Sequence, residues 1–139
     1  MALALSTCIG CSLQGKKLMG SALVGQLEVR TIAHPGTYQI DLSFNNPSNT
    51  ELFDVYLGDD RKVTITDSAG HVYLINKNQS SQPLNFTVAP DSQVNISLIL
   101  MDQIPASAET MRLQINNMTC PGGGRTPVLQ CSTDVTAKQ

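Results

Sequence analysis

The chain has 139 residues, a length that fits one domain, and its apolar content of 41% is sufficient for a single hydrophobic core. Charged residues make up only 14% of the chain, and its nine basic and eleven acidic residues give a net charge of -2. So little positive charge argues against the basic surface that nucleic-acid binding requires, and we expect no nucleic-acid partner.

The N-terminal segment, residues 1–22, is predicted to be either a processed signal or an extended arm. It is uncharged up to Lys16, and Ile9-Gly10-Cys11 resembles the end of a bacterial lipobox, where a small residue precedes the lipidated cysteine. On this interpretation Cys11 carries lipid and anchors the domain to a membrane. The alternatives are a first β-strand or a disordered tail.

Period-two alternation of apolar and polar residues dominates the rest of the chain. One early strand is expected from Leu23 to Ile32, with Leu27 inward. The clearest strand runs from Thr37 to Asn45 and has one strictly apolar face, made of Tyr38, Ile40, Leu42 and Phe44. Further strands are expected over residues 53–57, 62–66, 71–75, 84–88, 94–100 and 111–115, the last being the final strand, with a loop over residues 102–110.

Short strands separated by turn residues at roughly 8–12-residue spacing predict an all-β fold. We expect an immunoglobulin-like, two-sheet antiparallel sandwich of about 7–8 strands. Residues 23–139 would form this domain and end in a C-terminal hairpin of the disulfide type. No later segment has the roughly eighteen consecutive apolar residues that span a membrane.

The four cysteines leave three interpretations open. In the first, Cys8 leaves with a signal, Cys11 is lipidated, and Cys120 and Cys131 form a disulfide. In the second, two disulfides form in one of three pairings. In the third, all four thiolates hold zinc, although Cys120 and Cys131 are too far apart for the second short-spaced pair of such a site. We favour the Cys120–Cys131 disulfide and expect no metal and no cofactor.

The order of strand and turn motifs resembles a family of bacterial lipoprotein domains. A strand ends at Asn46, a D-x-x-G turn from Asp67 to Gly70 precedes Tyr73, a turn containing Pro90 opens a long strand, and a loop containing Pro105 precedes the next strand. The sandwich of that family is similar to that of the mycobacterial immunoprotective extracellular protein. The resemblance covers about residues 23–118 and implies an extracytoplasmic sandwich, with no catalytic residues to transfer.

No catalytic motif stands out. The two histidines, His34 and His71, fall in loop or turn settings, and a G-x-S-x-G nucleophile elbow is missing from the sequence, so we predict that the protein is not an enzyme. The glycine run at residues 122–124 before Arg125 is interpreted as a hairpin tip, because the Lys-Ser/Thr of a phosphate loop does not follow it.

Two further groups of residues have a functional and a plain interpretation. Four aspartates in the middle of the chain suggest a calcium site, but we favour turn carboxylates in solvent, with Asp67 accepting a local backbone hydrogen bond. The aspartates are Asp54, Asp59, Asp60 and Asp67. Four N-x-S/T sequons would accept glycans in a eukaryotic secreted protein and otherwise reflect a polar surface. They begin at Asn78, Asn85, Asn95 and Asn117.

The leading functional hypothesis is a non-catalytic binding module of the cell envelope or of the secreted fraction, lipid-anchored through Cys11, that meets a protein partner or assembles with itself. The first alternative is a structural subunit of a pilus, a filament or a phage or virus particle, in which the N-terminal segment packs on a neighbour. The second is a sandwich-type protease inhibitor that acts through an exposed loop, at residues 76–83 or 120–131.

Overall fold

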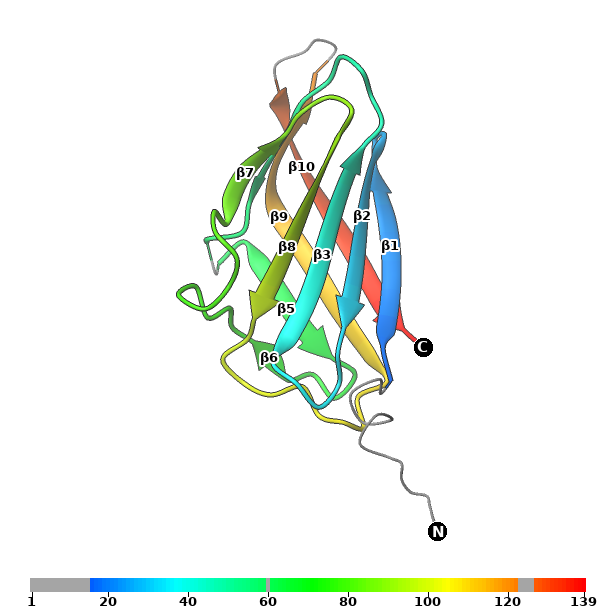
Figure 1. The fold of residues 1–139 in the computed structure, drawn as a ribbon, viewed down its shortest axis with the longest axis vertical. Helices are drawn as coiled ribbons and strands as arrows, with labels where there is room; N and C mark the ends of the chain where they lie inside the picture. Colours follow the sequence, from blue (N-terminus) through cyan, green and yellow to red (C-terminus); the bar gives the residue numbers. More distant parts are fainter. Residues whose placement is uncertain (1–15, 60, 123–126) are drawn as a thin grey trace.

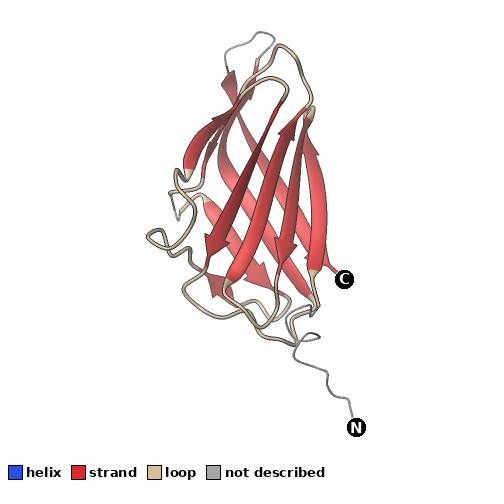
Figure 2. Cartoon of the chain, viewed as in Figure 1, coloured by secondary structure: helices blue, strands red, loops and turns tan. Residues whose placement is uncertain are grey.

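The computed structural model describes residues 16–59, 61–122 and 127–139. These residues form ten β-strands, and none of them lies in a helix (Figure 2). The strands are β1 (Leu18–Val24), β2 (Leu27–Ala33), β3 (Gln39–Asn46), β4 (Phe53–Tyr56), β5 (Val63–Asp67), β6 (Val72–Tyr73), β7 (Asn85–Val88), β8 (Ser92–Ile99), β9 (Thr110–Pro121) and β10 (Pro127–Lys138).

The strands pair into one antiparallel sheet that curls on itself. Its order is β6-β5-β9-β10-β1-β2-β3-β8, and β4 pairs with both β7 and β9. Figure 1 shows β1, β2, β3 and β8 on the near side, with β5, β9 and β10 passing behind them. A bridge between Ile75 and Leu100 brings the β6 end of the sheet beside the β8 end. The all-β prediction is therefore confirmed, as a curled sheet.

Alternation along the strands places the core on the inner face of the curl. In β3, Ile40, Leu42 and Phe44 are buried, as their period-two spacing predicts. Tyr38 was expected on the same face, but it precedes β3 and its side chain is 47% exposed. The largest fully buried side chains are Phe44, Phe53, Leu18, Leu27, Ile40, Leu42, Leu57, Ile65, Leu98, Leu100, Ile104 and Met111.

The single strand predicted from Leu23 to Ile32 is wrong. The chain forms a hairpin there, in which β1 and β2 are joined by a two-residue turn at Gly25 and Gln26. Gly25 has φ +60°, a left-handed conformation that glycine adopts without steric cost and that two-residue hairpins require. β1 begins at Leu18, within the segment that the sequence assigned to an N-terminal extension.

β1 and β10 pair over a very short stretch. The two strands share a single paired position, Met19 with Lys138, and Gly20 is the next residue of β1. A Cβ atom at Gly20 would overlap the backbone carbonyl of Thr136. A residue without a side chain is needed there because two backbones lie against each other.

The strand over residues 111–115 is not the last one. It belongs to β9, and β10 returns beside it to complete a long hairpin. β10 escaped prediction because its inward side chains are small or polar: Thr133, Val135 and Ala137 are buried, but they form no strong apolar alternation. The strands predicted over residues 53–57, 62–66, 71–75, 84–88 and 94–100 correspond to β4 to β8.

A polar face on the outer side of the sheet

Strand register sets polar side chains in rows across the outer face of β2, β3 and β8. Asp41 of β3 lies between Ile32 of β2 and Ser97 of β8. In the next row, Ser43 lies between Arg30 and Asn95. Their chain neighbours face the core, so these side chains face outward. We refer to this surface as the outer face.

Asp41 is the centre of a hydrogen-bond network on the outer face. Its Oδ1 accepts hydrogen bonds from Gln39 Nε2 and Ser97 Oγ, each at 2.8 Å, and its Oδ2 lies 2.8 Å from His34 Nε2. Partial burial raises the pKa of Asp41, but the hydrogen bonds from Gln39, His34 and Ser97 outweigh it and hold the pKa below the ordinary value. The carboxylate is therefore charged, and it fixes three neighbouring side chains.

A groove of about 460 Å³ runs across the outer face beside this network. Gln93 Nε2 donates to both Ser43 Oγ and Asn95 Oδ1 at 3.0 Å, which orders the amides on the β8 side. The groove is lined by Arg30, Ile32, Gln39, Asp41, Leu42, Ser43, Gln93, Asn95, Ile96 and Ser97. The groove therefore offers both hydrogen-bond donors and acceptors to a polar ligand, from amides, hydroxyls, a carboxylate and a guanidinium.

Arg30 supplies the positive charge in this groove. Its nearest carboxylate is Glu28, at 3.7 Å from Nε, which is too long for a hydrogen bond, and its side chain is 64% exposed. On the solvent-exposed side of β9 and β10, in contrast, Arg112 donates hydrogen bonds to Asp134 from Nε and Nη2, at 3.0 Å and 2.6 Å. The guanidinium of Arg30 therefore keeps donors available for a ligand, and that of Arg112 is engaged within the fold.

A second polar cluster surrounds the turn between β5 and β6. Tyr73 Oη donates to Asp67 Oδ2 at 2.7 Å, and burial together with the Asp67 carboxylate raises the pKa of Tyr73. Asp67 Oδ1 also accepts the backbone N–H groups of Ala69 and His71, so the predicted local hydrogen bond is confirmed. His71 Nε2 lies 3.1 Å from Asp102 Oδ2. These contacts hold the β5–β6 turn and explain the aspartate of its D-x-x-G sequence. The glycine is explained by the positive φ of Gly70, +86°.

The other aspartates of the suggested calcium site have separate partners. Asp54 accepts a hydrogen bond from Thr87 at 2.6 Å, Asp59 accepts one from the backbone N–H of Arg61 at 3.0 Å, and Asp60 lies outside the described residues. In the described part of the chain, no three His, Cys, Asp or Glu side chains gather closely enough to hold a metal ion.

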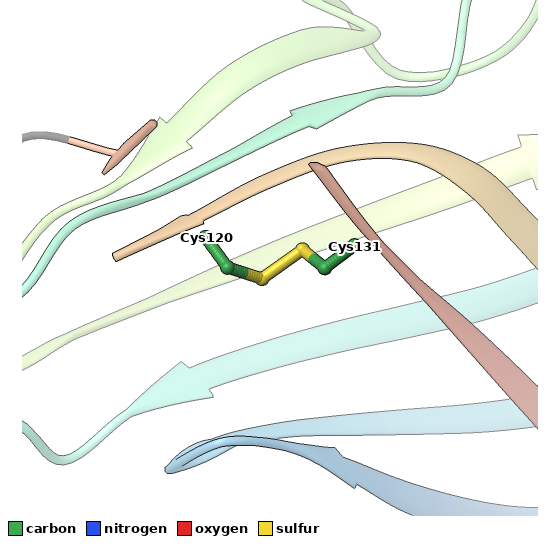
Figure 3. The surroundings of a disulfide bond; sticks show 2 residues. All are labelled: Cys120 and Cys131. Atoms are coloured by element: carbon green, nitrogen blue, oxygen red, sulfur yellow. A yellow bond between two sulfur atoms is a disulfide. The ribbon is translucent and has the colours of Figure 1, made fainter. Parts of the chain in front are cut away.

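Cys120 and Cys131 are joined by a disulfide between β9 and β10, as the sequence predicts (Figure 3). Their Cα atoms are 6.0 Å apart, although Cys131 pairs in register with Met118, so the bond runs diagonally across the hairpin. Cys8 and Cys11 lie outside the described residues, and so does most of the glycine-rich tip. The lipidation of Cys11 stays a prediction.

The four sequons occupy different settings. Asn78 is exposed in a turn, and Asn117 is half-buried in β9. Asn85 accepts the backbone N–H of Gly58 through its side-chain oxygen, at 3.1 Å. Asn95 lines the groove of the outer face. The fold thus uses two of these asparagines as hydrogen-bonding side chains.

Comparison of the chain with protein-family models, with curated proteins and with solved structures finds no match. The described residues also include no helix of the length and apolarity needed to cross a membrane. The function must therefore be argued from the residues of the outer face and their surroundings.

Sequence reasoning missed the outer face as a site. The alternation of residues 37–45 marked Asp41 and Ser43 as outward, but it could not show that Ser97, 56 residues later, donates to the same carboxylate. The signal that existed was the run of polar residues at alternate positions in two strands, β3 and β8.

Proposed function

We propose that the chain is a non-catalytic binding module that works outside the cytoplasm, and that it contacts its partner through the outer face of β2, β3 and β8. The observation that carries the proposal is the ordered polar groove beside Asp41. Its side chains are held by one another through the hydrogen bonds of Gln39, Ser97 and Gln93. Groups fixed before binding lose little conformational entropy when a partner arrives.

The same geometry favours binding over catalysis. Ser97, His34 and Asp41 are the residue types of a hydrolytic triad, but the hydroxyl of Ser97 donates to the carboxylate. A serine nucleophile needs a base that removes its proton, and this role falls to a histidine placed between serine and aspartate. Here His34 and Ser97 each approach Asp41, so the histidine does not stand between them.

The proposed location rests on the cysteines. Cys120 and Cys131 form a disulfide, and disulfides form and persist in oxidising compartments outside the cytoplasm. A lipid on Cys11 would anchor the module in a bacterial envelope, in agreement with the resemblance to lipoprotein domains. The finer fold assignment, an immunoglobulin-like two-sheet sandwich, belongs to the same proposal. In that assignment the curled sheet is treated as two sheets, with the boundary between β1 and β10, which share only one paired position.

Intact-mass analysis of the protein from its natural source tests the location. The proposal is supported if the measured mass is that of a chain that begins at a lipidated Cys11 and contains one disulfide. Free thiols at both Cys120 and Cys131 in that material would contradict it.

Photo-crosslinking tests the binding face. A benzophenone amino acid replaces Ser43 in the groove or, as a control, the exposed Ser132 of β10, and each protein is mixed with envelope extract. We expect a crosslinked product from position 43 that excess unmodified protein abolishes. Equal products from both positions, or none from position 43, would count against the outer face.

A structural subunit is the second candidate, and exposed apolar side chains on β1 favour it. Met19 is 55% exposed and Leu23 is 72% exposed, both on the outer side of the first described strand. A neighbouring copy could cover them in an assembly. Sedimentation velocity of the full chain over a range of concentrations decides between the two candidates, since an assembly subunit forms larger species as its concentration rises.

A further inference from the structure

The free edge of β8 is closed over one half of its length. The backbone groups of Ser97 and Ile99 point away from β3, towards the polar loop of residues 76–82. Ser97 donates to Ser81 Oγ at 3.0 Å and accepts from the Ser81 N–H at 2.9 Å. Ile99 donates to Ser80 Oγ at 2.8 Å and accepts from the Asn76 N–H at 2.7 Å. The hydroxyls of Ser80 and Ser81 thus accept the backbone N–H groups that would otherwise pair with a neighbouring strand.

The other half of the edge, at Gln93 and Asn95, pairs with no other strand in the described part of the chain. Alternate residues of a strand direct their N–H and C=O groups to the same side, so these two residues share the orientation of Ser97. β8 forms a ladder with β3 alone among the described strands. Proteins usually block such an edge with lysine, proline or a bulge. The ladder with β3 is unbroken from Ser92 to Ile99, and β8 contains no charged residue or proline.

Half-buried apolar side chains border this open edge. Val94 pairs in register with Phe44, and the ring of Phe86 from β7 packs edge-on against Phe44 with centroids 5.2 Å apart. Val94 and Phe86 both pack on the core and keep part of their surface exposed. A strand added beside β8 would place its inward side chains over these two residues and bury what they expose.

The charge around the edge selects the kind of segment. The strands that border the edge, β3, β4, β7 and β8, contain Asp41 and Asp54 and neither lysine nor arginine. Arg30 of the groove lies on β2, two strands away from the edge. An acidic segment would meet like charge here, and a segment that carries lysine or arginine would be attracted.

We propose that an extended segment of a partner protein adds to the sheet as a strand beside Gln93 and Asn95. The segment has apolar residues at alternate positions and basic residues between them. Its backbone pairs with the free N–H and C=O groups of β8, and its apolar side chains cover Phe86 and Val94. This inference rests on the proposed binding function and names the class of its partner.

Selection of a displayed library of random decapeptides on the full chain tests the inference. We expect enriched peptides that alternate apolar and other residues and carry lysine or arginine. The variant Asn95→Pro removes the outward N–H and places a ring at the edge, a change that edge strands tolerate. It should weaken peptide binding about tenfold or more, since a hydrogen bond and the close approach are both lost. The matched variant Asn95→Ala keeps the backbone N–H and removes only the side chain, so it should weaken peptide binding clearly less than Asn95→Pro does.

Amide hydrogen exchange on the wild type gives a second readout that does not depend on the folding of a variant. Bound peptide should slow exchange at Gln93 and Asn95 and leave Ser97 and Ile99 unchanged, because their N–H groups are already bonded. Unchanged exchange at Gln93 and Asn95 in the presence of peptide would overturn the edge assignment.

The remaining outcomes separate this inference from the proposed function. Peptides that lose affinity for Asn95→Ala as much as for Asn95→Pro would place the site in the groove, which overturns the edge and retains the binding module. A library that yields no enriched peptide also overturns the edge, and the crosslink from position 43 then decides the function independently. Self-association of the wild type that Asn95→Pro abolishes would make the occupant a second copy and contradict the partner assignment.

Discussion

Asn46, the last residue of β3, provides the sharpest test of how the fold is held together. Its side chain is 1% exposed and bonds in both senses. Nδ2 donates to the carbonyl oxygens of Glu51 at 2.8 Å and Ala89 at 3.1 Å, with that of Val88 at 3.3 Å, and Oδ1 accepts the N–H of Ser48 at 3.1 Å. One amide therefore ties the end of β3 to the following loop and to the end of β7.

The variant Asn46→Ala should lower the free energy of unfolding by about 3 kcal/mol. The N–H of Ser48 would be left unpaired in a buried position, which costs about 1–3 kcal/mol. The carbonyl oxygens of Glu51 and Ala89 are partly accessible to water, so each lost bond costs about 1 kcal/mol or less. At about 3–4 °C per kcal/mol for a domain of this size, the melting temperature should fall by roughly 10 °C.

Urea denaturation and thermal melting of three proteins provide the assay: wild type, Asn46→Ala and Asn45→Ala. Asn45 is the matched control, because it is the preceding residue, has the same side chain and is exposed on the opposite face. Its replacement should change stability by no more than about 0.5 kcal/mol. If the two variants unfold at the same urea concentration, the hydrogen bonds of Asn46 do not stabilise the fold by the expected amount.

Three other changes have expected outcomes that stability measurements can check. Gly20→Ala should cost about 1–3 kcal/mol in urea denaturation, because the new methyl group overlaps the Thr136 carbonyl and forces β1 and β10 apart. Replacing Cys120 and Cys131 by serine should cost about 3 kcal/mol, the chain-entropy value for residues eleven positions apart. Asp41→Asn should lower the melting temperature above about pH 4 and have progressively less effect at lower pH. The folded pKa of Asp41 lies below its ordinary value, so its contribution is present above the unfolded pKa of about 3.9 and is lost as pH falls through the folded pKa.

Each of these changes has its own control. Ser21→Ala, at the exposed position after Gly20, should leave stability within about 0.5 kcal/mol of wild type. Dithiothreitol should destabilise the wild type by the amount that the double serine variant loses, and should not affect that variant. For Asp41→Asn, a difference in melting temperature that stays constant from pH 7 to pH 2 would contradict the assigned role of the carboxylate.

The elements of the outer face were partly predictable. The polar positions of residues 37–45 follow from strict alternation, and the alternation of residues 94–100 marks the same pattern in β8. What could not be predicted is the register that sets Ser97 beside Asp41 and Asn95 beside Ser43. Register depends on which strands become neighbours, and β3 and β8 are separated in the chain by four other strands. The network that makes a site of these residues is therefore a tertiary property.

The sequence by itself determined the all-β class, most of the strands and the inward face of β3, and it favoured the Cys120–Cys131 pair. Each of these depends on local alternation, turn chemistry or spacing, which neighbouring residues specify. The tertiary structure decided the curl of the sheet, the contact at Gly20 and the open edge of β8, because these depend on which backbones meet. β10 shows the limit most clearly: its inward positions are too small and too polar to mark a strand, and only pairing along β9 makes it one.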